Sequence, residues 1–416
     1  MSNQTFSSFL KVYRPVNILM DEVKKRDYLF RTIKKDKKWK GGTYKIPLNT
    51  NKASSIKFGA LTATASIHEA GTTMGEESSY IEIYQSLKFN HLDLDLGDNY
   101  EGSYIKVLKD TIEPAAVLYK ELISNTILNG SRIDVLLTDG QVGGTCTVAN
   151  PERFEIGQLV ILRNSDLTAA AFFVTAIDMN AGTLTLSATR GGSGANISAY
   201  TTAKSSAIYF DNTVNTSNGA FQNSVNDLRS TVLSSDNGGG STIHGLTKAS
   251  YKQLQAHNKS LSASTAESLC EDIFKMVIET QKKGRGMANE VLVSYDNYAH
   301  IVASIETNRR FTVADSSFGY GFQSMSIRGI GGVLKITALR EMDNDIVFAI
   351  DWNAMKLAGY KWFVNETMEK TGSPFFVERE RSAGVGYEYI QDIKFYGNVV
   401  YYFLSYLAAG HSISIS

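Results

Sequence analysis

Two stretches of alternating apolar and polar positions lie in the first hundred residues. Residues 44–48 alternate from Tyr44 onwards, and residues 81–89 carry a second alternation that begins at Ile81. A period of two is typical of β-strands that bury one face. The segment between them, residues 49–79, is small and polar and is too long for a tight hairpin turn. The pattern predicts an extended arm in which these two strands form a pair.

A helical pattern follows in residues 100–129. Apolar side chains recur there at intervals of three to five positions, and Gly130 supplies the stop that is common after a helix. About 28 residues at roughly 1.5 Å each would form a rod of about 42 Å. Pro114 removes one backbone hydrogen bond from this rod, so we expect a kink there.

Residues 133–212 have the character of a separate β module. Short segments rich in β-branched or aromatic residues alternate with turn sequences, which is typical of a small barrel or sandwich. The expected strands are residues 145–148, 158–163, 171–177 and 183–186. A stretch rich in glycine and serine, residues 234–241, is interpreted as a hinge into the next part of the chain.

Helical and strand patterns alternate between residues 242 and 360, which predicts a mixed α and β region. A capping box at residues 264–267 opens a helix that turns its apolar side chains inward. Asp296 is interpreted as the cap of a second helix, residues 298–305. The inward residues of the first helix are Leu269, Ile273, Met276 and Val277, and the expected strands are residues 291–293, 333–337 and 346–350.

The C-terminal segment, residues 390–407, is apolar on both alternating faces. A strand of this kind is normally covered on both sides. We therefore expect this segment to need a covering partner. Its tyrosines fit either ordinary strand propensity or a subunit interface, where tyrosine is enriched.

The composition agrees with a globular protein and narrows its class. Of the 416 residues, 43% are hydrophobic and 20% are charged, which excludes a mainly disordered chain. Two cysteines, Cys146 and Cys270, exclude a disulfide framework and favour a reducing compartment. The longest apolar run is residues 399–409, about half of a membrane span, and the N-terminal residues lack the apolar core of a secretory signal. We expect a soluble protein.

Positive charge is concentrated near the N-terminus, although 42 basic residues balance 42 acidic residues over the whole chain. Residues 24–40 contain nine basic and two acidic residues, and nearby apolar residues, including Phe30 and Ile33, follow helical spacing. The pattern predicts a basic amphipathic helix. It is either a solvated face or a surface that attracts a polyanion without reading its sequence. In the second case, the residues that would face DNA are Lys24, Lys25, Arg26, Arg31, Lys34, Lys35, Lys37, Lys38 and Lys40.

The sequence lacks the usual motifs for catalysis or cofactor binding. The chain has no Gly-Lys dipeptide and so no phosphate-binding P-loop, no complete dinucleotide loop and no Cys-x-x-Cys pair. Its six histidines are scattered and lack metal-ligand spacing. Glu76 and Glu77 are adjacent in a strand-like segment, so their side chains would point to opposite faces and could not flank one bond. We expect no enzyme, no catalytic residue, no metal and no cofactor.

The order of these parts resembles the major capsid protein of tailed bacteriophages of the Hong Kong 97 type. The resemblance rests on a basic N-terminal segment, a long arm, a long kinked helix, a mixed region of helices and strands, and a C-terminal run of strands. The segments that carry it include residues 127–130, 291–298, 330–336 and 346–351. Residues 133–212 resemble the β insertion domain that some of these proteins carry.

The resemblance implies an α+β fold of the Hong Kong 97 type with an extended β-arm, a long spine helix and mixed axial and peripheral domains. Residues 1–40 would be a basic N-terminal arm or helix, 41–98 the extended loop (E-loop), 99–132 the spine helix of the peripheral domain, 133–212 a β-barrel-like insertion domain, 213–335 mostly the axial domain, and 336–416 peripheral-domain strands and the C-terminus. It also implies contacts between subunits. The candidate residues for these contacts are Lys52, Lys57, Phe58, Tyr401 and Phe403.

The same resemblance implies a structural protein that self-assembles from hexamers and pentamers into an icosahedral shell around double-stranded DNA. Its partners would be many copies of itself, the packaged DNA, and portal, scaffolding and decoration proteins, with no membrane. The protein would be made in the host bacterial cytoplasm and located in the virion capsid. An alternative that the sequence leaves open is a phage tail or decoration protein whose β module binds a ligand.

Overall fold

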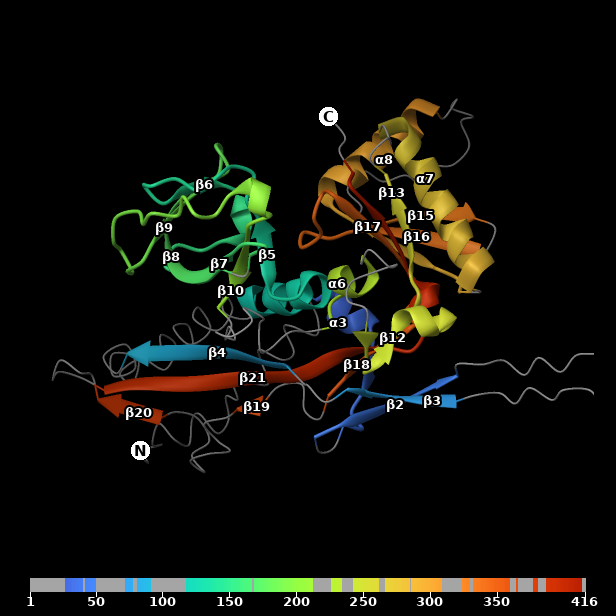
Figure 1. Cartoon of the computed structure of the whole chain (residues 1–416), viewed down its shortest axis with the longest axis horizontal. Coiled ribbons are helices and arrows are strands. Elements are labelled where there is room, and N and C mark those ends of the chain that lie inside the picture. The colour runs from blue at the N-terminus through green and yellow to red at the C-terminus, as the bar shows by residue number, and fades with distance from the viewer. Residues whose placement is uncertain are drawn as a thin grey trace, which may run out of the picture. The chain divides into compact units, whose positions relative to one another are not determined.

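The computed structural model contains two units (Figure 1). The main unit comprises Met1–Ser124 and Leu228–Ser416, and the β unit comprises Asn125–Asp227. The structure describes residues 27–39, 42–49, 72–77, 81–90, 117–166, 168–211, 226–233, 242–261, 266–284, 286–308, 324–329, 332–359, 364–365, 377–380 and 387–413. Residues 117–129 are helical, whereas the rest of the predicted long helix, with Pro114, lies outside the described residues.

One long strand, β21 (Tyr387–Tyr401), organises a six-stranded sheet of the main unit (Figure 1). Its antiparallel neighbours are β4 (Ile81–Asn90), β18 (Met355–Ala358), β19 (Val364–Asn365) and β20 (Val377–Glu380), and β1 (Lys34–Asp36) joins β18 in parallel. β4 follows β21 from Ile81, opposite Gly397, to Asn90, opposite Glu388. Segments about 300 positions apart in the sequence therefore form one sheet.

The arm is a hairpin of β2 (Tyr44–Asn49) and β3 (Thr72–Glu77). Tyr44 lies opposite Glu77, so these two residues mark the open end of the hairpin. The prediction that the first strand pairs with residues 81–89 is wrong, because that segment is β4 and pairs with β21. β3 was not predicted because its sequence, Thr-Thr-Met-Gly-Glu-Glu, has no apolar alternation.

A second six-stranded sheet of the main unit has the order β13-β22-β17-β14-β16-β15. Its strands are β13 (His257–Ser260), β22 (Ala408–His411), β17 (Ile346–Ile350), β14 (Glu290–Val293), β16 (Gly332–Ala338) and β15 (Ser324–Gly329). β14, β16 and β17 confirm the three strands predicted in this region. The domain boundary predicted between residues 335 and 336 falls within β16, and β17 and β22 share a sheet with β14, so this boundary does not separate two sheets.

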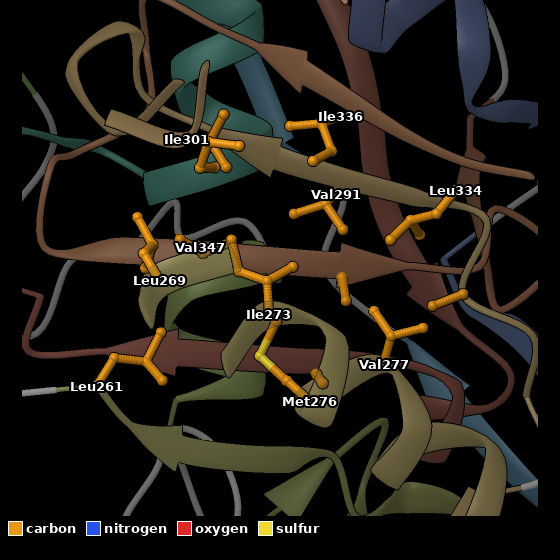
Figure 2. Packing of buried hydrophobic residues seen from close by; sticks show 14 of the residues in the cluster. Leu261, Leu269, Ile273, Met276, Val277, Val291, Ile301, Leu334, Ile336 and Val347 are labelled. Carbon is orange, nitrogen blue, oxygen red and sulfur yellow. The ribbon is translucent and has the colours of Figure 1, made fainter. Parts of the chain in front are cut away.

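Two helices, α7 (Ala266–Glu279) and α8 (Tyr295–Asn308), contribute to the core on this sheet. Figure 2 shows Leu269, Ile273 and Met276 of α7 beside Val291 and Val347 of the strands, all of them buried. The inward face predicted for this helix is confirmed. Burial of each such aliphatic side chain contributes roughly 1.5–3 kcal/mol, so the cluster is a main source of stability for the unit.

Helix α8 begins earlier than predicted, at Tyr295. The Ser294 hydroxyl accepts the Asn297 N–H at 3.2 Å, so Ser294 is the capping residue. The assignment of the cap to Asp296 is wrong, although this carboxylate still lies in the first turn, where negative charge is favourable. The predicted serine cap of α7 lies outside the described residues.

Short elements connect these sheets and helices in the main unit. They are α6 (Leu228–Val232), β11 (Thr242–Ile243), β12 (Leu246–Thr247), η3 (Lys248–Ser250), η4 (Lys252–Leu254), η5 (Thr280–Gly284) and η6 (Leu404–Tyr406). β11 and β12 form a small antiparallel hairpin whose turn is His244 and Gly245.

The described part of the basic N-terminal segment is not a continuous helix. α3 covers only five residues, Tyr28–Thr32, and the backbone is extended at Ile33. Residues Lys34–Asp36 then form β1 on β18. The predicted helix is therefore wrong from Ile33 onwards, because pairing with a distant strand outweighs a local helical preference. Phe30 and Ile33 are buried, as their spacing indicated.

The β unit contains one six-stranded sheet in the order β5-β10-β7-β8-β9-β6. Its elements are β5 (Arg132–Val135), β6 (Thr145–Thr147), η1 (Pro151–Arg153), β7 (Leu159–Arg163), β8 (Ala169–Asp178), β9 (Thr183–Ser187), η2 (Thr202–Lys204) and β10 (Ala207–Phe210). A bridge between Leu136, just after β5, and Val148, just after β6, joins the two edge strands. The sheet therefore curls back on itself, as a barrel does.

Candidate functional site

The open end of the arm hairpin meets a small group of side chains in the main unit, here called the arm root. The arm root consists of Tyr44, Glu77, His244, Tyr401 and Tyr402. Tyr44 and Glu77 are opposite each other in the hairpin, and His244 lies in the turn between β11 and β12. Tyr401 ends β21 and Tyr402 follows it. The arm is thus held where three distant segments of the chain converge.

Tyr44 anchors strand β2. Its hydroxyl donates to Asp36 Oδ2 at 3.0 Å, and its oxygen lies 3.2 Å from the Tyr402 hydroxyl. The Trp39 ring packs against it with the ring centroids 5.5 Å apart. Burial, together with the oxygens of Tyr402 and Asp36, raises the pKa of Tyr44. The Tyr44 phenol therefore stays protonated, and its O–H remains a donor to Asp36.

His244 anchors strand β3 through both its backbone and its ring. The His244 carbonyl accepts the Glu76 N–H at 3.0 Å, and ring Nδ1 lies 2.8 Å from Glu77 Oε2. The other ring nitrogen, Nε2, accepts the Tyr401 N–H at 3.0 Å. The ring also stacks on Tyr401 with the centroids 6.4 Å apart. One histidine thus joins the arm to the end of β21.

Near the root, the hairpin has one buried and one exposed face. Ile46 and Leu48 are buried, whereas Lys45 and Glu76 face solvent and form an ion pair of 3.9 Å. An exposed pair of this kind contributes at most about 1 kcal/mol, so the buried face holds the root in place. Glu76 turns to solvent and Glu77 to His244, in agreement with the expectation that the two carboxylates do not form one site.

The side chain of Tyr401 is not available to a neighbouring subunit. It is 0% exposed within its own chain, and so are Val399 and Val400. The structure therefore contradicts the predicted inter-subunit contact at Tyr401, and it contradicts the expectation that these residues need a covering partner, because the main unit covers them itself. Phe403 is half-buried and stacks on Tyr406 with the centroids 4.9 Å apart. The other inter-subunit candidates, Lys52, Lys57 and Phe58, lie outside the described residues.

The described basic residues of the N-terminal segment differ in their contacts. Lys35 donates to the Phe30 carbonyl, and its Nζ lies 4.2 Å from the centroid of the Phe30 ring, so its charge is engaged by its own chain. Arg31 lies over the Tyr28 ring at 5.9 Å. Lys37 and Lys38 are exposed. Lys24, Lys25, Arg26 and Lys40 lie outside the described residues.

Strands β1 and β18 bring two lysines side by side, here called the lysine pair. Lys34 lies opposite Lys356 in the parallel register. Lys34 Nζ donates to Asn353 Oδ1 at 2.5 Å, and Lys356 Nζ lies 4.7 Å from the centroid of the Tyr402 ring. Like charges on facing positions of neighbouring strands repel each other.

A buried carboxylate that the sequence analysis missed, Glu290, links α3 to the second sheet. Its Oε1 accepts the Tyr28 hydroxyl at 2.5 Å and the Thr337 hydroxyl, and its Oε2 accepts the Trp352 indole N–H at 2.6 Å. Lys335 Nζ lies 3.6 Å from Oε1 and donates to the Tyr28 oxygen at 2.6 Å. Burial alone would lower the pKa of Lys335, but the hydrogen bond with Tyr28 and the Glu290 charge outweigh it and raise that pKa. No motif signals this network, because its members are far apart in the sequence.

A second buried carboxyl, Asp27, caps α3. Its Oδ1 accepts the Phe30 N–H at 2.9 Å. Burial raises the pKa of Asp27 to about 6, although the Phe30 amide and the Ser124 hydroxyl partly offset this effect. Asp27 therefore titrates in mildly acidic solution.

The described residues hold no group of three or more histidine, cysteine, aspartate or glutamate side chains that could bind a metal ion. Within the same part of the chain, no helix combines the length and the apolar character needed to cross a membrane.

Comparisons with known proteins show a likeness of fold without a likeness of sequence. No protein-family model matches the chain, and no curated protein matches its sequence. The capsid of cyanophage A-1(L) is similar in structure, with a TM-score of 0.50 and 9% identity, over 96% of this chain and 93% of that chain. The procapsid of satellite phage P4 has a TM-score of 0.43 and 11% identity, over 100% of this chain and 99% of that chain. A virus-like particle from Pyrococcus furiosus has a TM-score of 0.41 and 8% identity, over 96% and 98% of the two chains.

The likeness to the cyanophage capsid concerns the fold and covers nearly the whole of both chains. Such coverage includes the strands and helices of both units rather than one shared motif. This chain therefore has the capsid fold that the order of its parts predicted, the fold of the Hong Kong 97 type.

Proposed function

We propose that this chain is a major capsid protein, a structural protein of which many copies assemble into an icosahedral shell. The observation that carries the proposal is the capsid fold over 96% of the chain. The arm hairpin adds to it, because a projecting hairpin is a means of contacting a neighbouring copy. Contacts of this heterologous kind, repeated around rotation axes, close into rings and shells.

The arm root supports an arm that acts between subunits. The hairpin is anchored on its own chain at Tyr44 and Glu77, and its opposite ends, at Asn49 and Thr72, lead into residues 50–71. We assign the contact with a neighbouring copy to this segment. Lys52, Lys57 and Phe58, the remaining inter-subunit candidates besides Phe403, belong to it.

The β unit fits the role of an insertion domain. It is a compact unit of its own, and its sheet pairs strands that all lie between Arg132 and Phe210. We assign Asn125–Asp227 to this domain, a wider range than the 133–212 expected from the sequence.

Shell formation is the direct test. The purified chain, alone or expressed together with a scaffolding protein, should form shells, tubes or capsomers that are visible by negative-stain electron microscopy and sediment as large particles. A chain that remains monomeric in both settings would show that it is not a capsid protein.

Shortening the arm is expected to abolish assembly without unfolding the main unit. In the test variant, residues 50–71 are replaced by Asn-Gly, a two-residue turn that suits a hairpin closed at Asn49 and Thr72. All three tryptophans of the chain lie outside the β unit, so their fluorescence reports on the main unit and should be unchanged. Particles of normal yield from this variant would contradict the role assigned to the arm.

We further propose that the basic strand β1 and its flanking lysines face packaged double-stranded DNA. Lys34, Lys37 and Lys38 are exposed, and Lys356 adds a fourth positive charge beside Lys34. Their attraction to phosphate would not depend on the base sequence, because phosphate contacts carry no sequence information. The location in the virion capsid follows from the same proposal.

Replacing Lys34, Lys37 and Lys38 together by alanine should weaken binding of the unassembled chain to double-stranded DNA. For each phosphate that the variant no longer neutralises, the slope of log K against log salt should also become shallower by about 0.9. Fluorescence anisotropy across a salt series measures both quantities. The matched control replaces three other exposed lysines, Lys252, Lys275 and Lys282, and removes the same charge.

The comparison between the two variants decides the DNA proposal. A loss that is equal in both would show a dependence on net charge alone and not on the β1 lysines. Lys35 is left intact in both, because its contacts with Phe30 are structural.

A further inference from the structure

His244 is held in a demanding conformation inside the arm root. Its φ of +50° lies in the left-handed region, which non-glycine residues adopt at a cost. Its side chain is 0% exposed, so its two ring nitrogens take their partners from the protein. A β-carbon on Gly75 of the arm would lie 3.2 Å from the His244 β-carbon, so the arm backbone and the turn are in close contact.

The hydrogen bonds of the His244 ring define its protonation state. A backbone N–H is only a donor, so the nitrogen that receives the Tyr401 N–H at 3.0 Å, Nε2, carries a lone pair and no proton. The proton of the neutral ring is therefore on Nδ1 and is donated to Glu77 Oε2 at 2.8 Å. A doubly protonated ring would place its Nε2–H against the Tyr401 N–H, donor against donor. Protonation thus preserves the contact with the arm and breaks the contact with β21.

We propose that His244 is a proton-operated latch of the arm root: the neutral ring docks the arm on the end of β21, and the protonated ring releases Tyr401 while it keeps hold of β3. The inference deepens the proposed function and rests on it, because the docking of the arm has a role in assembly only if the arm contacts neighbouring copies. The latch itself is a property of the single chain.

The charged and titratable groups around the ring come from three elements. β3 presents the Glu77 carboxylate, which attracts an imidazolium, while Glu76 turns away to pair with Lys45. β21 presents the Tyr401 ring on one face and the Tyr401 N–H at Nε2. β2 contributes Tyr44, opposite Glu77. The two states of the ring thus have different partners, which is the requirement for a switch.

Release of Tyr401 would leave the other strand of the arm attached. The Tyr44 hydroxyl contacts Asp36 and Tyr402, and neither contact involves His244. Acid would therefore let the root pivot on β2 and would not detach the arm. Release of Tyr401 would change the direction of the arm, and this change would alter the contact of the arm with a neighbouring copy.

Hydrogen exchange on the unassembled full-length chain tests the latch. Peptides that contain the Tyr401 amide are followed at pH 7.5 and pH 5.0, with correction for the intrinsic exchange rates. The protection of this amide should fall at least tenfold at pH 5.0, while that of β14 should not change. In the His244→Gln variant, which has no titratable ring and keeps an acceptor oxygen, protection should be equal at the two pH values.

Two controls separate His244 from other groups. The pKa of Asp27 is about 6, so Asp27 changes charge between the two pH values, and a fall in protection that it caused would persist in the His244→Gln variant. The matched control is His411→Gln, which removes a more exposed histidine whose Nδ1 lies 3.0 Å from the Ser412 hydroxyl. This variant should retain the full effect of acid on the Tyr401 amide.

Three results would overturn the latch. They are equal protection at both pH values in the native chain, a fall that persists in His244→Gln, and nuclear magnetic resonance of ¹⁵N-labelled histidine that places the neutral proton of His244 on Nε2. The last measurement needs no variant and so does not depend on how well His244→Gln folds. Acid-dependent exchange in a chain that never forms particles would leave the latch standing and reject the proposed function.

Discussion

Replacing Glu290 by alanine is expected to lower the free energy of unfolding of the main unit by about 3–5 kcal/mol. The carboxylate is buried and accepts hydrogen bonds from Tyr28, Thr337 and Trp352. Its removal leaves these donors facing a cavity and leaves the Lys335 ammonium without its counter-ion at 3.6 Å. Each donor left unsatisfied in the interior costs about 1–3 kcal/mol, whereas the Lys335 side chain is 37% exposed and its charge stays hydrated.

Urea unfolding followed by tryptophan fluorescence measures this loss, because all three tryptophans lie in the main unit and Trp352 is itself a partner of Glu290. Glu290→Gln, which keeps the volume and one acceptor, should lose less than the alanine variant. The control is Glu271→Ala, which removes an exposed carboxylate paired with Lys275 and should change stability by no more than about 0.5 kcal/mol. A loss below about 1 kcal/mol in Glu290→Ala would show that the network contributes little.

Replacing Gly194 by alanine should destabilise the β unit and leave the main unit unchanged. An added β-carbon at Gly194 would lie 1.6 Å from the Gly143 carbonyl oxygen, and backbone cannot move aside as the end of a side chain can. The crowded segment is fixed by two hydrogen bonds, from Ala195 N–H to the Leu186 carbonyl and from Leu186 N–H to the Gly144 carbonyl, both 2.8 Å. Overpacking of this kind costs about 3 kcal/mol.

Cys146 is the cysteine of the β unit, and its labelling is followed separately from that of Cys270, a half-buried cysteine of the main unit. Its thiol is buried in β6, and burial raises its pKa to about 12, so it reacts only when the unit opens. A loss of about 3 kcal/mol in the free energy of unfolding of the β unit in Gly194→Ala should speed the labelling of Cys146 by a thiol reagent roughly 100-fold. The tryptophan fluorescence of the main unit should stay constant. The matched control is Gly143→Ala, because a β-carbon there meets nothing within 4 Å. Equal labelling rates in the two variants would contradict the close approach of the two segments.

The elements that could be predicted from the sequence are those whose pattern reflects burial within a few neighbouring positions. The strand predicted at residues 346–350 is β17, buried along its whole length, and the inward face of α7 follows its helical spacing. In a strand with both faces covered, or in a helix with one apolar stripe, the pattern of apolar residues itself indicates which faces are buried.

The elements that were missed owe their structure to distant partners. β1 is a strand because it pairs with β18, although its sequence, Lys-Lys-Asp, is equally compatible with an exposed helix. β3 is polar and pairs with β2 through backbone hydrogen bonds that no side-chain pattern records. In both places the tertiary contact decides the structure.

The arm root shows the same limit for function. In the sequence, the histidines show no metal-ligand spacing, and Glu77 stands out only as one of two adjacent carboxylates. His244, Glu77 and Tyr401 come from three remote segments, so their contact could not be predicted from spacing. The left-handed backbone of His244 became visible only in the structure.

The pairing of the first strands with the last has a consequence for biosynthesis. β1 and β4 cannot pair until β18 and β21 have been synthesised, about 300 residues later. Every strand of the β unit, in contrast, pairs with a strand between Arg132 and Phe210. The pairing of strands so far apart in the sequence is slow and occurs late, whereas a module with local contacts can fold during translation. The arm root therefore forms only after Tyr401 and Tyr402 have been synthesised, long after the hairpin that it holds.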